Sequence, residues 1–464
     1  MYYKNFASAV MAALMISRIE VTPKLLGNND SVNNPLIWIT MDKNNLTNSS
    51  KSRSIQNLPS VKTFDHDENE NYNIYMINRS YLHNFSREIH SRRRYCGGFV
   101  VHQDQKDHKK HVQKVELAGR MDVQEFRYTI DQGEIVNEFM RVISKIQIEE
   151  TINGLTDFNN RYFESDDGVK ASEWLKVQWD NITIDRPDIV VEYYKHGPLS
   201  KQPSVIASIQ GATNDIVIVG AHLDSIIGDT GSMENNDEKA PGADDNASGV
   251  AILTEVLSSI AKTGYKPSKT IKVMAFGAEE VGLIGSRDIA QEYKSKGYNV
   301  VGMLNFDMVA YKGSKEDIFI YHDTHTNPGQ NRFLGHIINK YMPELTVGHS
   351  QCPGTYAGCS DHFSWAIEGF PASYVSESDI KEDSGYMHTI NDTKVNVFHA
   401  TKFAKLAAIY LIELAKDFKM TFKPKQSVAT TTIRSRSSII EIERNCAMLR
   451  NDFRILPFLI FFYI

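Results

Sequence analysis

The chain has 464 residues, of which 41% are hydrophobic and 23% are charged, and its formal net charge is −6. This length is sufficient for a large hydrophobic core together with a further domain or pro-segment. The mild acidity argues against nucleic acid as the main partner. No apolar run reaches the roughly 18 residues that a membrane-spanning helix needs, and four cysteines exclude a disulfide scaffold but leave room for one bridge.

The first 130 residues differ in character from the rest of the chain. Lys4 and the apolar run Phe6–Ile16 make residues 1–20 resemble a secretory signal peptide, although an ordinary N-terminal helix has the same pattern. Residues 21–130 are rich in Asn, Ser, Lys and His, and the basic run Ser91–Arg94 within them is either a solvated turn or a processing site. We expect this region to be a pro-segment or small accessory region, partly disordered.

Residues 131–418 alternate between strand-like and helix-like apolar patterns. The predicted strands are Ile189–Tyr194, Ser204–Ile209, Ile216–Ala221, Ile271–Phe276, Val300–Phe306, Ile318–Tyr321 and Pro371–Val375. The predicted helices are Gly133–Ile148, Gly168–Trp179, Ser248–Ala261, Arg287–Lys296, Asn331–Tyr341 and Ala400–Lys416. This alternation predicts a three-layer α/β/α domain whose central mixed, mostly parallel sheet is covered by helices on both faces. Residues 419–464 predict a poorly structured C-terminal tail.

Two adjacent carboxylates, Glu279 and Glu280, follow the predicted strand Ile271–Phe276. Open α/β sheets build their sites at the carboxyl ends of strands, and neighbouring residues there point in different directions. One glutamate can therefore face a metal while the other faces a substrate. A solvated glutamate pair at a helix start has the same sequence, so this pair has to be weighed with other stretches.

Two histidines and further acids occupy similar positions. His222 and Asp224 end a predicted strand two residues apart, so a metal-binding imidazole would have a carboxylate for its other N–H. A strand-end histidine without metal and a helix-capping acid are the ordinary explanations of such residues. The other candidates are Asp245 after a glycine turn, Asp307 at a strand end and His388 in a loop. Together with Glu280 they form a mixed nitrogen and oxygen set that suits Zn²⁺, with Mn²⁺ or Co²⁺ as substitutes.

These stretches resemble the zinc-dependent aminopeptidase family with a co-catalytic dinuclear site, and most of all its secreted bacterial leucyl aminopeptidases. The likeness extends from about Ile146 to about Ala415 and includes Asn159–Phe163 and His399–Phe403. It implies two Zn²⁺ per chain, Asp245 as the bridging ligand and a cis peptide bond after Asp245. The implied metal ligands are His222, Asp245, Glu280, Asp307 and His388.

The resemblance also implies the reaction, which is hydrolysis of the N-terminal peptide bond of peptides or proteins by a monomeric enzyme. Glu279 would be the general base, Asp224 the partner of His222, and Tyr356 a stabiliser of the tetrahedral oxyanion. Glutaminyl cyclases with one zinc and carboxypeptidases share the scaffold, and metal-free receptor modules are a third alternative. The five filled ligand positions favour the aminopeptidase.

Cys352 and Cys359 lie in a loop where the family often has a disulfide. A bridge would require an oxidising compartment and agrees with secretion, whereas two reduced thiols are the alternative. The cysteines are further apart than in close relatives, which leaves the placement of Tyr356 open. Secreted relatives carry an inhibitory N-terminal pro-segment, so we expect a zymogen.

The residues expected to bind the substrate side chain are Met308, Tyr374, Ile380, Asp383 and Met387. An apolar neck with an acid at its end would accept the stem of Lys or Arg and then pair its charge. If the acids instead form a solvated loop, the pocket prefers Leu or another hydrophobic residue. The sequence leaves both preferences open.

Overall fold

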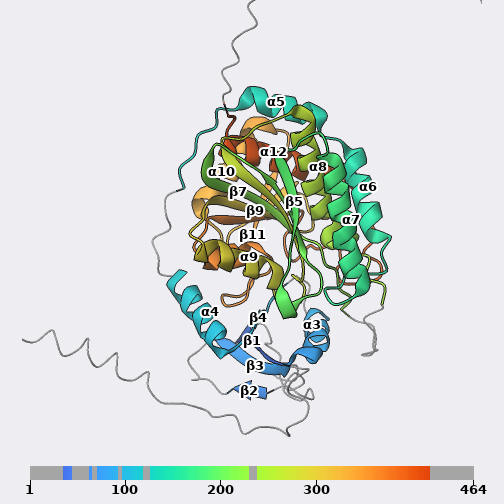
Figure 1. Cartoon of the computed structure of the whole chain (residues 1–464), viewed down its shortest axis with the longest axis vertical. Helices are drawn as coiled ribbons and strands as arrows, with labels where there is room; N and C mark the ends of the chain where they lie inside the picture. The colour runs from blue at the N-terminus through green and yellow to red at the C-terminus, as the bar shows by residue number, and fades with distance from the viewer. Residues whose placement is uncertain are drawn as a thin grey trace, which may run out of the picture. The chain divides into compact units, whose positions relative to one another are not determined.

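The computed structural model describes residues 35–43, 62–64, 71–91, 97–118, 126–228 and 238–418 (Figure 1). The predicted signal peptide of residues 1–20, the arginines of the basic run and the C-terminal tail lie outside these residues. Among the helices within these ranges, none is both long enough and apolar enough to cross a membrane.

A mixed sheet of eight strands forms the centre of the larger part, in the order β11-β10-β12-β9-β7-β8-β6-β5. Its strands are β5 (Ile189–Tyr194), β6 (Ser204–Ile209), β7 (Thr213–His222), β8 (Lys269–Phe276), β9 (Asn299–Phe306), β10 (Ile318–Tyr321), β11 (Val347–Ser350) and β12 (Ala372–Ser376). Strands β12, β9, β7 and β8 run parallel to one another, as do β10 and β11. The antiparallel pairs are β10 with β12, β6 with β8 and β5 with β6.

Helices cover both faces of this sheet (Figure 1). Alternate residues of β7 point to opposite faces, so that Val217 and Val219 pack in one core and Ile216 and Ile218 in another. The first core also contains residues of α5 (Gly133–Val142), α6 (Lys145–Thr156), α7 (Asp166–Ile182), α8 (Gly249–Thr263), α10 (Pro328–Tyr341) and α12 (Val397–Ala415). The second contains residues of α9 (Ile284–Ser295) and α11 (His362–Ile367). The predicted three-layer arrangement is confirmed.

A smaller antiparallel sheet, with the order β2-β3-β1-β4, precedes this domain in the chain. Its strands are β1 (Leu36–Asp42), β2 (Lys62–Phe64), β3 (Tyr72–Asn78) and β4 (Val100–His102), and two helices accompany it, α3 (Leu82–His90) and α4 (Gln105–Ala118). We call residues 35–118 the accessory region. Apolar side chains of β1, β3 and α3 share one buried core with Ala278, Val281 and Ile284 of the larger part.

One segment differs from the sequence-based expectation. The single helix predicted over Gly133–Ile148 is two helices, because the extended Ser144 separates them and its hydroxyl accepts from Ile146 N to cap α6. Ser144 N donates to Glu255 of α8, which fixes the break. The described residues of the accessory region form regular strands and helices, and the expectation that residues 21–130 are partly disordered stays a prediction.

Candidate metal centre

The acids and histidines singled out in the sequence meet at the carboxyl end of three adjacent strands. β7 lies between β8 and β9 and pairs with both in parallel, so the ends of the three strands share one edge. His222 ends β7, Glu279 and Glu280 follow β8, and Asp307 follows β9. Asp245 comes to this edge from the turn Ala243–Ser248, and His388 from the loop before α12.

The bridging candidate Asp245 faces a different histidine with each carboxylate oxygen. Oδ1 lies 3.1 Å from His222 Nε2, which is 3.3 Å from Asp307 Oδ1. Oδ2 lies 3.0 Å from His388 Nε2, which is 3.1 Å from Glu280 Oε2. Donor atoms around a tetrahedral zinc with bonds of about 2.0–2.1 Å are about 3.3–3.4 Å apart. Each of these pairs therefore has a spacing close to that of two ligands on one metal ion.

The chemistry of these donors fits divalent cations. His222 Nε2, Asp307 Oδ1 and both carboxylate oxygens of Glu280 are buried and make no hydrogen bond within the described part of the chain. Buried polar atoms nearly always have such partners. Donors that are buried, aimed at one another and made of imidazole and carboxylate are what Zn²⁺ binds. The peptide bond between Asp245 and Asn246 is cis, as the family resemblance predicts.

Burial and mutual charge shift the pKa values of the centre strongly. Burial raises the pKa of Glu280 to about 7, against the opposing effect of His388. Burial would lower the pKa of His388, but Glu280 and Asp245 raise it to about 10. Burial also raises the pKa of Glu279 well above its usual value. Divalent cations at these positions would favour the deprotonated carboxylates and so bring the acid pKa values down again.

Asp224 holds the loop that carries both glutamates. Its Oδ1 accepts a hydrogen bond from Glu279 N at 2.9 Å and its Oδ2 one from Glu280 N at 3.1 Å. His222 Nδ1 lies 3.1 Å from the backbone oxygen of Asp224 and 3.6 Å from its Oδ1. Asp224 therefore orients His222 mainly through its carbonyl, while its carboxylate fixes the two glutamates.

Arg161 is a supporting residue to which sequence reasoning assigned no role. It is fully buried, and its guanidinium donates to the carbonyls of Leu155, Leu223, Pro241 and Gly242. The carbonyls of Leu223, Pro241 and Gly242 belong to the segments next to His222 and Asp245, and that of Leu155 belongs to α6. Its only signal in the sequence is its place in the family-like stretch Asn159–Phe163.

Two further supports come from Asp392 and Ser360. The carboxylate of Asp392 accepts from Asp244 N and Asp245 N, which orients the bridging acid. The hydroxyl of Ser360 donates to Asp307 Oδ2 at 2.6 Å. Neither residue is recognisable as a support from the sequence, because holding a metal-ligand candidate in place depends on tertiary contacts.

A third histidine, which the sequence analysis did not identify, also reaches the centre. His90 ends α3 of the accessory region and is 2% exposed. Its Nε2 lies 3.5 Å from Glu280 Oε2, and its ring centroid lies 4.5 Å from that of His388. His90, Glu280 and His388 form a group of donor atoms that all lie within 4.8 Å of one another.

The predicted oxyanion residue Tyr356 packs against the accessory region. Its ring centroid is 4.6 Å from that of Tyr72 in β3, and its backbone N donates to Asp42 of β1. The neighbouring Cys352 and Cys359 form a disulfide, as predicted. The oxyanion role of Tyr356 stays a prediction.

The predicted substrate-binding residues lie in different surroundings. Tyr374 and Ile380 belong to an apolar cluster with Phe319, Tyr321 and Cys359. Met308 is buried with a left-handed backbone, and its carbonyl accepts from Ser376 Oγ and Glu377 N. Asp383 accepts from Gly385 N in its own loop, and Met387 is half-buried next to His388.

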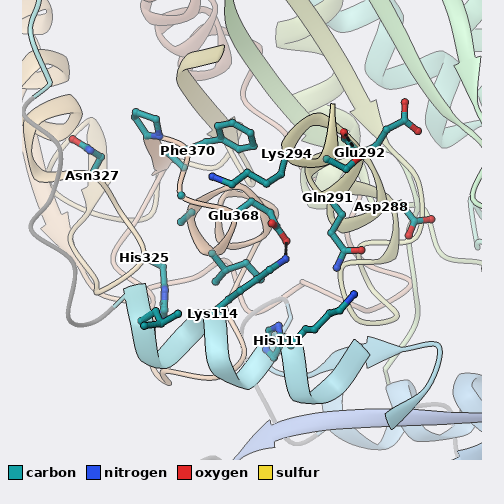
Figure 2. Close-up of a pocket in the computed structure, with 18 of the residues that line it drawn as sticks. His111, Lys114, Asp288, Gln291, Glu292, Lys294, His325, Asn327, Glu368 and Phe370 are labelled. Carbon is teal, nitrogen blue, oxygen red and sulfur yellow. Dashed lines mark hydrogen bonds and ion pairs between the residues drawn. The ribbon is translucent and has the colours of Figure 1, made fainter. Parts of the chain in front are cut away.

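A cavity of about 980 Å³ lies elsewhere in the molecule, between α4, α9 and the segment 366–372 (Figure 2). Figure 2 shows Lys114 of α4 reaching Glu368, with which it forms an ion pair. None of the metal-ligand candidates is among the residues that line this cavity. The metal-ligand candidates themselves are buried, and this cavity lies at another contact between the accessory region and the larger part.

The fold and the centre together define a metal-dependent hydrolase of the α/β/α type, and comparisons with known proteins agree. The model of peptidase family M28 matches residues 204–425. The probable aminopeptidase YDR415C of Saccharomyces cerevisiae is 34% identical over 296 residues, which cover 61% of this chain and 77% of that protein. Leucine aminopeptidase 1 of Arthroderma gypseum is 35% identical over 304 residues, covering 62% of this chain and 79% of that protein.

Two solved structures from Legionella pneumophila are similar over a longer part. LapB is 25% identical with a TM-score of 0.69, covering 82% of this chain and 99% of LapB. The LapA aminopeptidase is 26% identical with a TM-score of 0.69, covering 82% of this chain and 98% of LapA. This chain belongs to peptidase family M28 and is a zinc-dependent aminopeptidase.

Proposed function

We propose that this enzyme uses two zinc ions, held by His222, Asp245, Glu280, Asp307 and His388, to remove the N-terminal residue of peptides. The observation that carries the proposal is the Asp245 carboxylate, whose oxygens lie 3.1 and 3.0 Å from the two histidines. When bound, the zinc ions would lower the pKa of a water molecule and polarise the scissile carbonyl.

Glu279 is the proposed general base. Its carboxylate is fully buried, and neither oxygen makes a hydrogen bond within the described residues, so both are available to a water molecule. Asp224 fixes its backbone N, and His222 and Glu280 lie within 4.8 Å of it. In the proposed reaction Glu279 accepts a proton from the attacking water and donates it to the leaving amine.

The proposal includes a substrate with a free N-terminus. Two Zn²⁺ ions would outweigh the negative charges of Asp245, Glu280 and Asp307, so the neutral form of the substrate α-amine, whose lone pair can approach a metal position, is the form expected to bind at this buried centre. The apolar cluster around Tyr374 and Ile380 supports a preference for Leu or another hydrophobic residue over Lys or Arg. Relatives named leucine aminopeptidase support the same preference.

The organisation of the chain supports secretion as a zymogen. We propose a signal peptide over residues 1–20, a pro-segment or accessory region over 21–130, a catalytic domain over 131–418 and an appended tail over 419–464. The disulfide between Cys352 and Cys359 agrees with an extracellular location. We further propose that the enzyme acts as a monomer.

A panel of aminoacyl chromogenic substrates, assayed with the full-length chain, tests this function. Leucyl anilide should be hydrolysed and its N-acetylated form should not, because the free amine is required. A chelator should abolish the activity and Zn²⁺ should restore it, and metal analysis should find two zinc ions per chain. One zinc ion together with cyclisation of an N-terminal glutaminyl peptide would instead establish a cyclase.

A further inference from the structure

Helix α3 places its polar groups directly against the metal centre. Its buried residues include Leu82, Phe85, Ser86, Ile89 and His90, which lie three and four positions apart and so share one face of the helix. The apolar members pack with Ala278, Val281 and Ile284, which flank the two glutamates. The helix is therefore anchored to the loop that carries Glu279 and Glu280.

Ser86 fixes the orientation and the tautomer of His90. The Ser86 hydroxyl donates its single proton to the carbonyl oxygen of Glu280 at 2.6 Å. Toward His90 Nδ1, 3.1 Å away, the same hydroxyl must then act as an acceptor, so Nδ1 carries the hydrogen. In neutral His90 the lone pair is therefore on Nε2. That atom faces the carboxylate of Glu280, so a divalent cation between the two groups would bind a donor atom of each.

This arrangement is the usual one for a metal-binding histidine, whose second ring nitrogen is held by a hydrogen bond. His90 Nε2 lies 3.5 Å from Glu280 Oε2, close to the spacing of two ligands on one zinc ion. The other donors of this position are His388 and Asp245. His388 Nε2 lies 3.1 Å from Glu280 Oε2 and 3.0 Å from Asp245 Oδ2.

We propose that His90 is a fourth protein ligand of the zinc position formed by Asp245, Glu280 and His388, and that the accessory region thereby closes this position against substrate. The inference rests on the proposed dizinc function. Zinc sites with four protein ligands are structural and closed, whereas catalytic sites keep one position for water or substrate. His90 occupies that place in the closed state, so the full-length chain hydrolyses substrate only through the fraction of molecules in which α3 has left the centre.

The test compares His90→Ala with His83→Ala in the full-length chain. His83 is the matched control because it lies on the same helix, with its ring 4.6 Å from Tyr162 and outside the donor groups. His90→Gln is a second variant that keeps most of the side-chain volume. Each purified protein is dialysed against a competing chelator, its zinc content is measured, and the visible spectrum of the Co²⁺ form is recorded.

Loss of His90 should lower the binding affinity for one of the two zinc ions by about tenfold or more. This is the scale on which metal affinity responds to the loss of a supporting group. The Co²⁺ spectrum should change in both His90 variants and stay as in the wild type in His83→Ala. With zinc present in excess, leucyl anilide hydrolysis should rise by about tenfold when the closed state is removed.

Identical zinc retention and Co²⁺ spectra in all variants would overturn the ligand assignment. If the Co²⁺ spectrum changes in the His90 variants but their hydrolysis does not exceed that of a wild type that is already active, the proposed closure is wrong. If no variant hydrolyses any aminoacyl anilide but the spectra still differ, the coordination stands and the proposed peptidase function fails instead.

Discussion

The two sheets of this protein use their buried polar groups differently. At the edge of the larger sheet, polar groups bind partners within the same domain: Arg161 donates to four carbonyls, and Asp224 accepts from Glu279 and Glu280. The accessory region directs Asp42 and His90 at residues of the larger domain. The larger domain thus supports its metal centre by itself, and the accessory region is an addition that binds to that centre.

Glu279→Gln should have the largest effect within the larger domain. The amide cannot accept the proton of water, so kcat should fall by about 10²–10⁴-fold, the usual contribution of a general base. Zinc content should remain two per chain, because the five proposed ligands are intact. Glu280→Ala is the contrasting variant and should lose metal. Near-normal turnover of Glu279→Gln would contradict the proposed role.

Arg161→Leu should disrupt the hydrogen bonds by which the larger domain supports its own metal centre. Removing the guanidinium takes a hydrogen-bond donor from four buried carbonyls, of which Gly242 O keeps its second donor, Ala247 N. We expect a loss of about 3–5 kcal/mol in the free energy of unfolding, measured by urea denaturation, and a weaker retention of zinc.

Arg186→Leu provides the matched control for that change. Arg186 is also buried and donates to Ile260 O and Tyr265 O, away from the metal ligands. The Arg186→Leu variant should have a lower free energy of unfolding but should keep its zinc. Equal zinc loss in the two variants would show that Arg161 has no special connection to the centre.

Asp42→Asn should loosen only the accessory region. Asp42 accepts hydrogen bonds from the backbone N of Thr355, Tyr356 and Ala357, and the amide of asparagine would turn an N–H₂ group toward one or more of these donors. We expect the free energy of opening the accessory region to fall by about 1–3 kcal/mol. This should be seen as faster hydrogen exchange in residues 71–118 and 355–357. Asp167→Asn, at an exposed ion pair, should leave exchange unchanged. If Asp42→Asn also leaves it unchanged, this contact does not hold the accessory region in place.

The same difference between the regions explains what the sequence could predict. The strands of the larger domain have continuous apolar patterns, and the ligand candidates follow them directly, so His222, Glu280 and Asp307 are recognisable from local sequence. Ser86 and Glu280 are 194 residues apart, and Asp42 and Thr355 are 313 apart. Contacts over such separations depend on how two surfaces fit, and the polar sequence around α3 resembles that of a solvated helix. The break at Ser144 was missed for the same reason, because its partner Glu255 lies on another helix.

Asp383→Asn should have the smallest effect, and it separates the two side-chain preferences that the sequence left open. One oxygen of Asp383 accepts from Gly385 N within its own loop, whereas Tyr374 and Ile380 lie in an apolar cluster. A carboxylate that already binds its own loop contributes little to a lysyl side chain. The other oxygen, Oδ2, is buried and makes no hydrogen bond within the described residues. We expect leucyl anilide to have the higher kcat/KM in the wild type, and Asp383→Asn to change the ratio of lysyl to leucyl kcat/KM by less than about twofold, or about 0.4 kcal/mol. Tyr374→Ala serves as the contrasting variant, because Tyr374 is proposed to line the side-chain pocket and its loss should lower leucyl kcat/KM by about tenfold or more. A wild type that prefers lysyl anilide, and loses that preference on Asp383→Asn, would show that the acid ends a basic-residue pocket.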